Sequence, residues 1–205
     1  MYLSSFRLGD HPEQLSALFG ANKMIAVIAN ATDDLQTNEE RKLKVEREIE
    51  WLNALGLHAD EIDLRDYFDK ADKLKEKISE YGGVWVRGGN TFNLVRAARQ
   101  SGFDKIILEK NKEKDFVYAG YSAGICFLTP DLHGIELVDD PNIIPAGYDS
   151  EIIWEGLNLL DFYIAPHYQS PDHPESPLVE KEVEFLKANN MPYKALRDGE
   201  VIIRQ

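Results

Sequence analysis

Short apolar runs alternate with longer amphipathic segments over the first 128 residues, and this alternation limits the fold more than any other feature. Runs at 23–29, 57–64, 83–87 and 115–120 have the length of buried strands. The segments that follow the first three carry apolar residues at helical spacing, with charged residues on the opposite side. Strand and helix in alternation predict an α/β fold, a three-layer sandwich with a mostly parallel central sheet and helices on both faces.

The clearest predicted helix covers residues 38–55. Thr37 and Glu40 have the spacing of a capping box at its start, and Gly56 stands where a helix usually ends. Further helices are predicted over 69–81, 91–100 and 104–111, and around 179–189. A short helix that ends at residue 128 is predicted after the strand at 115–120. Residues 129–160 hold several Pro and Gly and predict loops and short strands, and 161–165 predict another strand. Two short strand candidates, 193–196 and 200–203, flank Asp198-Gly199, which predicts a hairpin.

Composition limits the class of protein. A chain of 205 residues predicts one domain over 1–205, and 23 Lys and Arg against 36 Asp and Glu give a net charge of −13. This charge argues against nucleic acid and anionic membranes as partners, because both are bound by clustered cations. An anionic substrate would need a local cation to offset the overall field. No run approaches the roughly 18 apolar residues that span a bilayer.

One cysteine, Cys126, cannot form an internal disulfide, excludes Cys-rich zinc sites and fits a reducing compartment. The first residues lack the charged segment and apolar run of a signal peptide. We therefore expect a cytoplasmic protein. Cys126 comes four residues after Ser122, inside the apolar run Ile125-Cys126-Phe127-Leu128, and we expect it to pack in the core.

Gly120-Tyr121-Ser122-Ala123-Gly124 lies between a predicted strand and a predicted helix. In that context a G-x-S-x-G motif is typical of a tight turn that presents a nucleophilic serine, here Ser122. The N–H of Ala123, at the start of the helix, can donate to an oxyanion. The simpler alternative is a turn of small residues with Ser122 as a helix cap.

A serine nucleophile needs a base, and His167 is the candidate among five histidines. It directly follows the apolar strand at 161–165, at the sheet edge where Ser122 is also expected. The alternative is a structural histidine held by hydrogen bonds. For the group that orients His167 we considered the acidic residues between serine and histidine. Glu136, apolar on both sides, is the first choice and Asp139 the second.

Gly88-Gly89-Asn90 follows another predicted strand. Two glycines let the backbone approach a ligand closely, so the N–H of Gly89 can be the second oxyanion donor and the side chain of Asn90 can hold the substrate backbone. The alternative is a plain strand–helix turn capped by Asn90. Neither the dinucleotide-binding nor the phosphate-loop pattern is present.

Together, Gly-Gly-Asn-Thr-Phe at 88–92, Gly-Tyr-Ser-Ala-Gly at 120–124 and Ala-Pro-His-Tyr at 165–168 resemble the peptidase E family of serine dipeptidases. The resemblance covers nearly the whole chain and extends, in fold, to the class I glutamine amidotransferases. It implies a flavodoxin-like fold, no metal, no cofactor, and hydrolysis of dipeptides that begin with aspartate. Carried over to this chain, it makes Ser122 the nucleophile, His167 the base, and Gly89 and Ala123 the oxyanion donors.

We therefore expect a serine peptidase whose partner is a small peptide. An aspartyl side chain would need a cation, and Arg87 beside the Gly-Gly-Asn turn is one candidate, unless its side chain points into a helix-covered face. Two alternatives stay open. One is an esterase or other acyl hydrolase that uses the same serine turn at 120–124, and the other is a catalytically silent binding protein on this fold. The sequence does not predict the oligomeric state.

Overall fold

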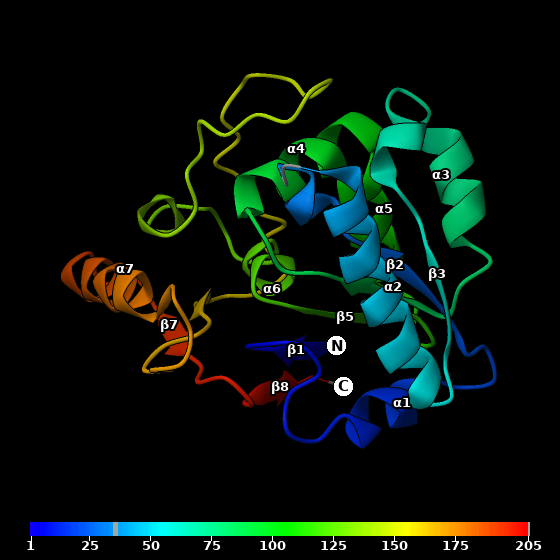
Figure 1. Cartoon of the computed structure of the whole chain (residues 1–205), viewed down its shortest axis with the longest axis horizontal. Helices are drawn as coiled ribbons and strands as arrows, with labels where there is room; N and C mark the ends of the chain where they lie inside the picture. Colours follow the sequence, from blue (N-terminus) through cyan, green and yellow to red (C-terminus); the bar gives the residue numbers. More distant parts are fainter. Residues whose placement is uncertain (35–36, 205) are drawn as a thin grey trace.

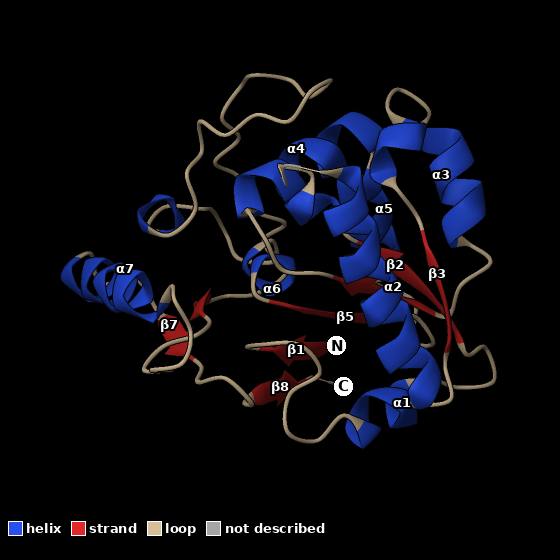
Figure 2. Ribbon diagram, in the orientation of Figure 1, coloured by secondary structure: helices blue, strands red, loops and turns tan. Residues whose placement is uncertain are grey.

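The computed structural model describes residues 1–34 and 37–204, and its centre is a six-stranded sheet (Figures 1 and 2). The strands are β1 (Tyr2–Ser4), β2 (Met24–Ile28), β3 (His58–Glu61), β4 (Gly83–Val86), β5 (Val117–Tyr121), β6 (Tyr163–Ala165), β7 (Tyr193–Ala195) and β8 (Val201–Ile203). The helices are α1 (Glu13–Leu18), α2 (Asn38–Ala54), α3 (Ala71–Ile78), α4 (Thr91–Ser101), α5 (Phe103–Lys110), α6 (Ala123–Cys126) and α7 (Ser176–Ala188), with short 3₁₀ turns at Asn30–Thr32, Leu64–Tyr67 and Ile135–Leu137.

The strands of the main sheet run in the order β3-β2-β4-β5-β1-β8. All neighbours pair in parallel except β1 and β8, which are antiparallel. β6 and β7 form a separate parallel pair. The predicted α/β class with a mostly parallel sheet is confirmed.

Alternate residues of each strand face opposite layers. In β2, Ile25 and Val27 belong to the apolar cluster that includes Leu15 of α1 and Leu52 of α2. Ala26 and Ile28 belong to the cluster formed with α3, α4 and α5. Because side chains of a strand alternate between faces, the continuous apolar run buries both sides of the sheet and produces the three layers.

The predicted start and end of α2 are also confirmed. Thr37 Oγ1 accepts the N–H of Glu40 at 3.1 Å, and Gly56 adopts φ +78° just past the last turn. A left-handed residue at this position suits glycine, which has no Cβ to clash. No helix among the described residues is both long enough and apolar enough to cross a bilayer.

The hairpin predicted at Asp198-Gly199 is wrong. The strand before it, β7, pairs in parallel with β6, and the strand after it, β8, pairs with β1 at the edge of the main sheet. The connection is bound instead to the turn after β1, since Asp10 N–H donates to Gly199 O at 2.9 Å and Ser5 N–H donates to Glu200 O at 3.0 Å. The strand β1 and the helix α1 were not predicted.

The parallel strands β2, β4, β5 and β1 all end at one edge of the sheet. Polar turns follow each of them, and the pair β6–β7 with α7 lies beyond this edge, at the left of Figure 1. Ligands of open α/β sheets bind outside the carboxyl ends of the strands. We therefore expect the functional site at this edge of the sheet.

Candidate active site

Ser122 stands at a sharp turn between β5 and α6. Its backbone has φ 51° and ψ −120°, a conformation that a residue with a side chain rarely adopts. Gly120 and Gly124 make the turn feasible: a Cβ on either would lie 2.5 or 2.1 Å from the carbonyl oxygen of Val86 in β4. The motif therefore presents Ser122 on a strained turn packed tightly against the neighbouring strand.

His167 follows β6 directly and is also held at positive φ, 62°. Its side chain is 2% exposed, and its Nδ1 lies 2.6 Å from Oδ1 of Asp198. A carboxylate on Nδ1 fixes the ring and the tautomer with Nδ1–H, which leaves Nε2 as the proton acceptor. This is the arrangement of an oriented general base.

Asp198 is itself held in place. Its N–H donates to Ser170 Oγ at 2.9 Å, and Ser5 Oγ donates to its carboxylate at 3.2 Å. The same Ser5 oxygen accepts the N–H of His167 at 2.9 Å. The turn after β1 thus connects the histidine to the aspartate that orients it.

The structure corrects the predicted third residue. The carboxylate of Glu136 accepts the N–H of Gly134 at 2.6 Å and forms no hydrogen bond with His167. Asp139, the second choice, accepts the N–H of Thr91 at 2.8 Å. Asp198 comes after His167 in the chain, outside the segment between Ser122 and His167 in which the orienting acid was expected. Asp198 also stands directly after a strand candidate, the feature that had singled out His167.

Ser122 and His167 line one cavity of about 530 Å³, together with Gly88, Gly89 and Asn90. Gly88 lies against the serine, since a Cβ there would be 2.8 Å from Ser122 Cβ. The structure thus brings Ser122, His167 and the Gly-Gly-Asn turn to one place.

The backbone amides of Gly89 and Ala123 stay the predicted oxyanion donors: Gly89 lines this cavity, and Ala123 directly follows Ser122. Gly89 has φ +148°, and in the described chain its N–H donates to no backbone oxygen. Ala123 is the first residue of α6, where an N–H has no acceptor within the helix. A tetrahedral intermediate on Ser122 carries an oxyanion that needs donors of this kind.

Asn90 lines the cavity, but its side chain holds local structure. Its Oδ1 accepts the N–H of Asn93 at 3.2 Å as the cap of α4, and its Nδ2 donates to Asp140 O at 2.9 Å. The side-chain amide of Asn90 therefore holds the segment around Asp139 beside the cavity. The capping role, given above as the alternative, is the one that these contacts show.

Arg87 also lines the cavity, but a buried carboxylate engages it. Its Nε lies 3.2 Å from Oε1 of Glu48, which is 3% exposed, and its Nη1 donates to Gly88 O at 2.8 Å. Glu48 comes from α2 and also accepts from Trp85 and Tyr121. The side chain of Arg87 thus points toward the helix-covered face, and Glu48 offsets its charge.

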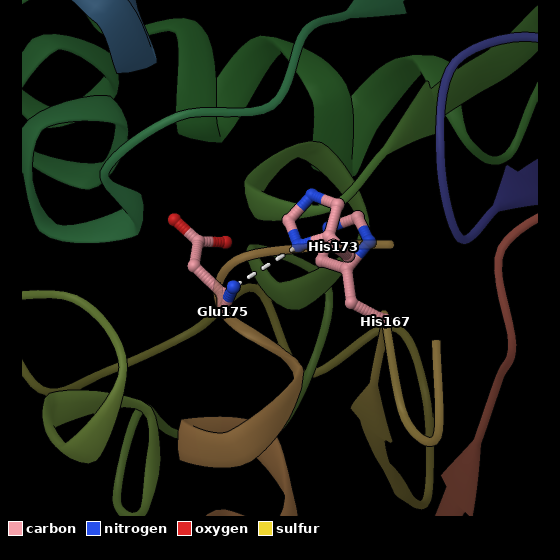
Figure 3. A group of neighbouring side chains, drawn as sticks. All are labelled: His167, His173 and Glu175. Carbon is pink, nitrogen blue, oxygen red and sulfur yellow. Dashed lines mark hydrogen bonds between the residues drawn. The ribbon is translucent and has the colours of Figure 1, made fainter. Parts of the chain in front are cut away.

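A second histidine packs on the first (Figure 3). The rings of His167 and His173 are stacked, with centroids 3.6 Å apart and planes 4° apart, and Phe6 meets both edge-on. Burial lowers the pKa of His167, the hydrogen bond to Asp198 raises it, and the charge of His173 lowers it further. The base is therefore expected to be neutral at pH 7, as proton abstraction requires.

His167, His173 and Glu175 are residue types that bind Zn²⁺, and their ligand atoms lie within 4.8 Å of one another (Figure 3). An imidazole binds a metal through a lone pair in the plane of its ring. Two stacked, parallel rings do not direct their lone pairs at one ion, and His173 Nδ1 already accepts the N–H of Glu175 at 3.3 Å. As arranged, the cluster fits proton transfer better than metal binding.

Buried acids lie close to Ser122 and His167. An enclosed space of about 20 Å³, enough for one water, is lined by Ser122, His167, Cys126, Asp139 and Glu182 among others. Burial raises the pKa of Asp139 to about 7 and that of Glu182 to about 8. Cys126 is 4% exposed and packs in the core as predicted, and this burial raises the pKa of its thiol.

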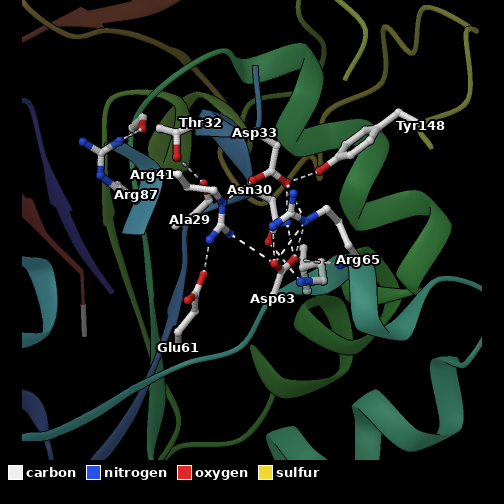
Figure 4. A network of polar contacts seen from close by, with 12 residues as sticks. Ala29, Asn30, Thr32, Asp33, Arg41, Glu61, Asp63, Arg65, Arg87 and Tyr148 are labelled. Carbon is white, nitrogen blue, oxygen red and sulfur yellow. Dashed lines mark hydrogen bonds and ion pairs between the residues drawn. The ribbon is translucent and has the colours of Figure 1, made fainter. Parts of the chain in front are cut away.

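A polar network anchors the edge of the sheet beside the cavity (Figure 4). Arg41 of α2 pairs with Asp33, Glu61 and Asp63, and the hydroxyl of Tyr148 donates to Asp33, whose side chain is fully buried. The network ties the turn after β2 to α2, β3 and the long segment before β6. It is structural support for the site, without a contact to Ser122 or His167.

Comparison with known proteins places this arrangement in a family. The model of peptidase family S51 matches residues 9–205. A protein named "Uncharacterized peptidase Lmo0363" of Listeria monocytogenes is 29% identical over 170 residues, 82% of this chain and 78% of that protein. "Peptidase E" of Streptomyces coelicolor is 32% identical over 142 residues, 67% of this chain but 54% of that protein. "Probable alpha-aspartyl dipeptidase" of Drosophila melanogaster is 30% identical over 151 residues, 72% of this chain and 55% of that protein.

Solved structures share the fold. A crystal structure from Listeria monocytogenes EGD-e, described as a "Putative Peptidase E Protein", superposes with a TM-score of 0.74 at 25% identity, over 100% of this chain and 96% of that one. A peptidase from an acI-B1 actinobacterium superposes with a TM-score of 0.68 at 13% identity, over 100% of this chain and 82% of that one. Since the family model extends over almost the entire chain and the fold agrees throughout, the chain belongs to peptidase family S51.

Proposed function

We propose that this protein is a serine peptidase that hydrolyses short peptides, dipeptides with N-terminal aspartate among them. The observation that carries the proposal is the strained Ser122 in one cavity with His167, whose Nδ1 is held by Asp198 at 2.6 Å. Membership of family S51 and the names of its relatives, among them an alpha-aspartyl dipeptidase, support the same reaction class.

In the proposed reaction Ser122 Oγ attacks the peptide carbonyl carbon while its proton passes to Nε2 of His167. The N–H groups of Gly89 and Ala123 donate to the oxyanion. The tetrahedral intermediate collapses, the C–N bond breaks, and His167 returns the proton to the leaving amine. Water, deprotonated by the same histidine, then attacks the ester on Ser122 and releases the acid. Asp198 keeps the ring oriented and stabilises the imidazolium.

The direct test is turnover of a substrate panel. We expect Asp-Leu, Ala-Leu and Lys-Leu to be cleaved at different rates, with Asp-Leu preferred, and Ser122→Ala to lower kcat by about 10⁴-fold or more. Release of leucine is measured by chromatography. Hydrolysis of short-chain esters without peptide cleavage would instead show an acyl hydrolase, and absent turnover of both would show a binding protein. Turnover that persists in Ser122→Ala would show that Ser122 is not the nucleophile.

A further inference from the structure

The turn after β1 is part of the candidate active site. β1 pairs in parallel with β5, and Ser4 is the register partner of Tyr121, the residue before Ser122. Residues 5–9 therefore leave the sheet at the same edge as the nucleophile and one strand away from it, on the side opposite the Gly-Gly-Asn turn after β4. Neighbouring strands are about 4.8 Å apart, so this turn lies within reach of a peptide bound at Ser122.

This turn is joined to the base. Ser5 Oγ accepts the N–H of His167, and the ring of Phe6 packs edge-on against His167 with centroids 5.6 Å apart. Phe6 also lines the cavity that holds Ser122. Residues 5–7 and His167 therefore lie on the same side of the site.

Arg7, the next residue, has features of a ligand-binding cation. It is an exposed, non-glycine residue with φ 51°, a conformation that costs on the order of 1 kcal/mol or more. Its guanidinium stacks over Phe6 at 4.6 Å and over Trp51 at 5.2 Å from the ring centroids. Within the described chain it forms no ion pair and no side-chain hydrogen bond. Aromatic contacts hold the plane of the guanidinium and leave its N–H groups for a ligand.

The other cations of the site are engaged. Arg87 is paired with Glu48, and Lys44 lies 2.9 Å from Glu40. Arg7 instead lines a neighbouring cavity of about 340 Å³, which shares the lining residue Phe6 with the Ser122 cavity and is also lined by Trp51 and Asp10. In a chain of net charge −13, Arg7 is a cation near the site that no carboxylate pairs with among the described residues.

The position of Arg7 determines which part of a bound peptide its guanidinium contacts. In the reaction proposed above, on which this inference rests, His167 protonates the leaving amine, so the leaving group lies on the His167 side. In a dipeptide, that amine is two bonds from the α-carboxylate of the leaving amino acid. We propose that Arg7 binds this carboxylate through its planar N–H edge and thereby selects dipeptides over longer or amidated substrates.

The experiment compares Asp-Leu with Asp-Leu-amide, which lacks the C-terminal charge. We expect the wild-type protein to prefer the free acid by tenfold or more in kcat/KM. Arg7→Gln is expected to lower kcat/KM for the acid by about 10–100-fold, the range of a charge-assisted hydrogen bond, and to change it for the amide by less than threefold. Arg7→Gly, which also relieves the positive φ, is expected to show the same loss of preference.

Lys105→Gln is the matched control, because it removes one exposed positive charge from α5, outside the residues that line the site. It is expected to leave both rates within twofold. An unchanged acid-to-amide ratio in the Arg7 variants, or an equal fall for both peptides, would overturn the proposal.

Asn-Leu forms the third arm of the test. If Arg7→Gln abolishes a preference for Asp-Leu over Asn-Leu and keeps the preference for acid over amide, Arg7 binds the side chain of the first residue and the proposal is wrong. Failure of the peptidase function itself is distinguishable, because then the wild-type protein cleaves none of these peptides.

Discussion

At the scale of single residues, the contact between His167 and Asp198 defines the chemistry. We expect Asp198→Asn to lower kcat by about 10³–10⁴-fold with little change in KM, because an amide cannot hold the productive tautomer or stabilise the imidazolium. Glu136→Gln is the matched control, since this carboxylate caps only Gly134, and it should change kcat less than threefold. Steady-state kinetics on a cleaved dipeptide measure both. A larger loss in Glu136→Gln than in Asp198→Asn would contradict the assignment.

The pH dependence tests the surroundings of the base. Because His167 must be neutral to accept a proton and its pKa is lowered below 6.5, kcat/KM should rise with pH along a limb centred below pH 6.5. His173 lowers this pKa, so His173→Phe, which keeps a stacked ring without the charge, should move the limb to higher pH. A limb that stays in place in the variant would show that His173 does not act on the base.

The sequence predicted Ser122 and His167 because each directly follows an apolar strand. The expected common sheet edge is wrong, since β6 pairs with β7 outside the main sheet, yet both residues line one cavity. The sequence did not predict Asp198 as the orienting residue. The order of residues along the chain does not determine which carboxylate meets a ring nitrogen. That contact depends on where Ser5 and Ser170 hold the carboxylate, which only the folded arrangement shows.

At the scale of elements, the long buried strands and amphipathic helices were predicted well, and the short edge strands were not. β1 has three residues and gains its partners from β5 and β8, which are far away in the sequence. Asp198-Gly199 does turn the chain, with φ +97° at Gly199, but the strands beside it pair with β6 and β1. Short strands carry too little local information to identify their partners.

The junction of α2, β3 and the turn after β2 rests on Arg41 (Figure 4). Arg41→Met should destabilise the protein by about 1–3 kcal/mol, because Glu61 would lose its cation while Asp33 and Asp63 would keep only Arg65. Arg47→Met, at an exposed position of the same helix, is the control and should stay within about 0.5 kcal/mol. Urea denaturation measures both free energies of unfolding. Equal stability of the two variants would contradict a role of the network in holding this edge.

At the scale of the whole molecule, the buried acids should make stability fall as pH rises. Burial raises the pKa of Glu182 from 4.5 to about 8, with Asp139 and Glu136 adding to the shift. Below pH 4.5 this group is protonated in both the folded and unfolded states. Between pH 4.5 and 8 the unfolded state loses the proton first, so the free energy of unfolding decreases with pH. Above pH 8 the group is ionised in both states, and the loss of stability that its burial causes is constant.

Glu182→Gln removes this cost. We expect the variant to match the wild-type protein at pH 4 and to be more stable by about 1–3 kcal/mol at pH 8, a rise in Tm of a few degrees. Glu184→Gln, exposed on the same helix, should show no such trend. Thermal unfolding followed across this pH range measures the effect, and a Glu182→Gln variant less stable than wild type at pH 8 would show that the carboxylate is ionised and paired.

The three-layer architecture could be predicted from the pattern of apolar runs, because a continuous buried run in an α/β chain needs cover on both faces. The pairing of charged side chains around the site could not be predicted from the sequence. The net charge of −13 indicated that an anion would need a local cation, and Arg87 was the candidate in the sequence. The structure pairs Arg87 with Glu48 of α2, a contact across 39 residues that no local pattern reveals, and places Arg7 over Phe6 without a carboxylate partner among the described residues.

The central claim is that Ser122, activated by His167 and Asp198, is the nucleophile. The most direct measurement is labelling with a fluorophosphonate, followed by intact mass and peptide mapping. We predict one adduct per chain on Ser122, none in Ser122→Ala, and labelling at least 100-fold slower in Asp198→Asn, while Glu136→Gln is labelled at the rate of the wild-type protein. An adduct on another residue, or no adduct on the folded protein, would contradict the account.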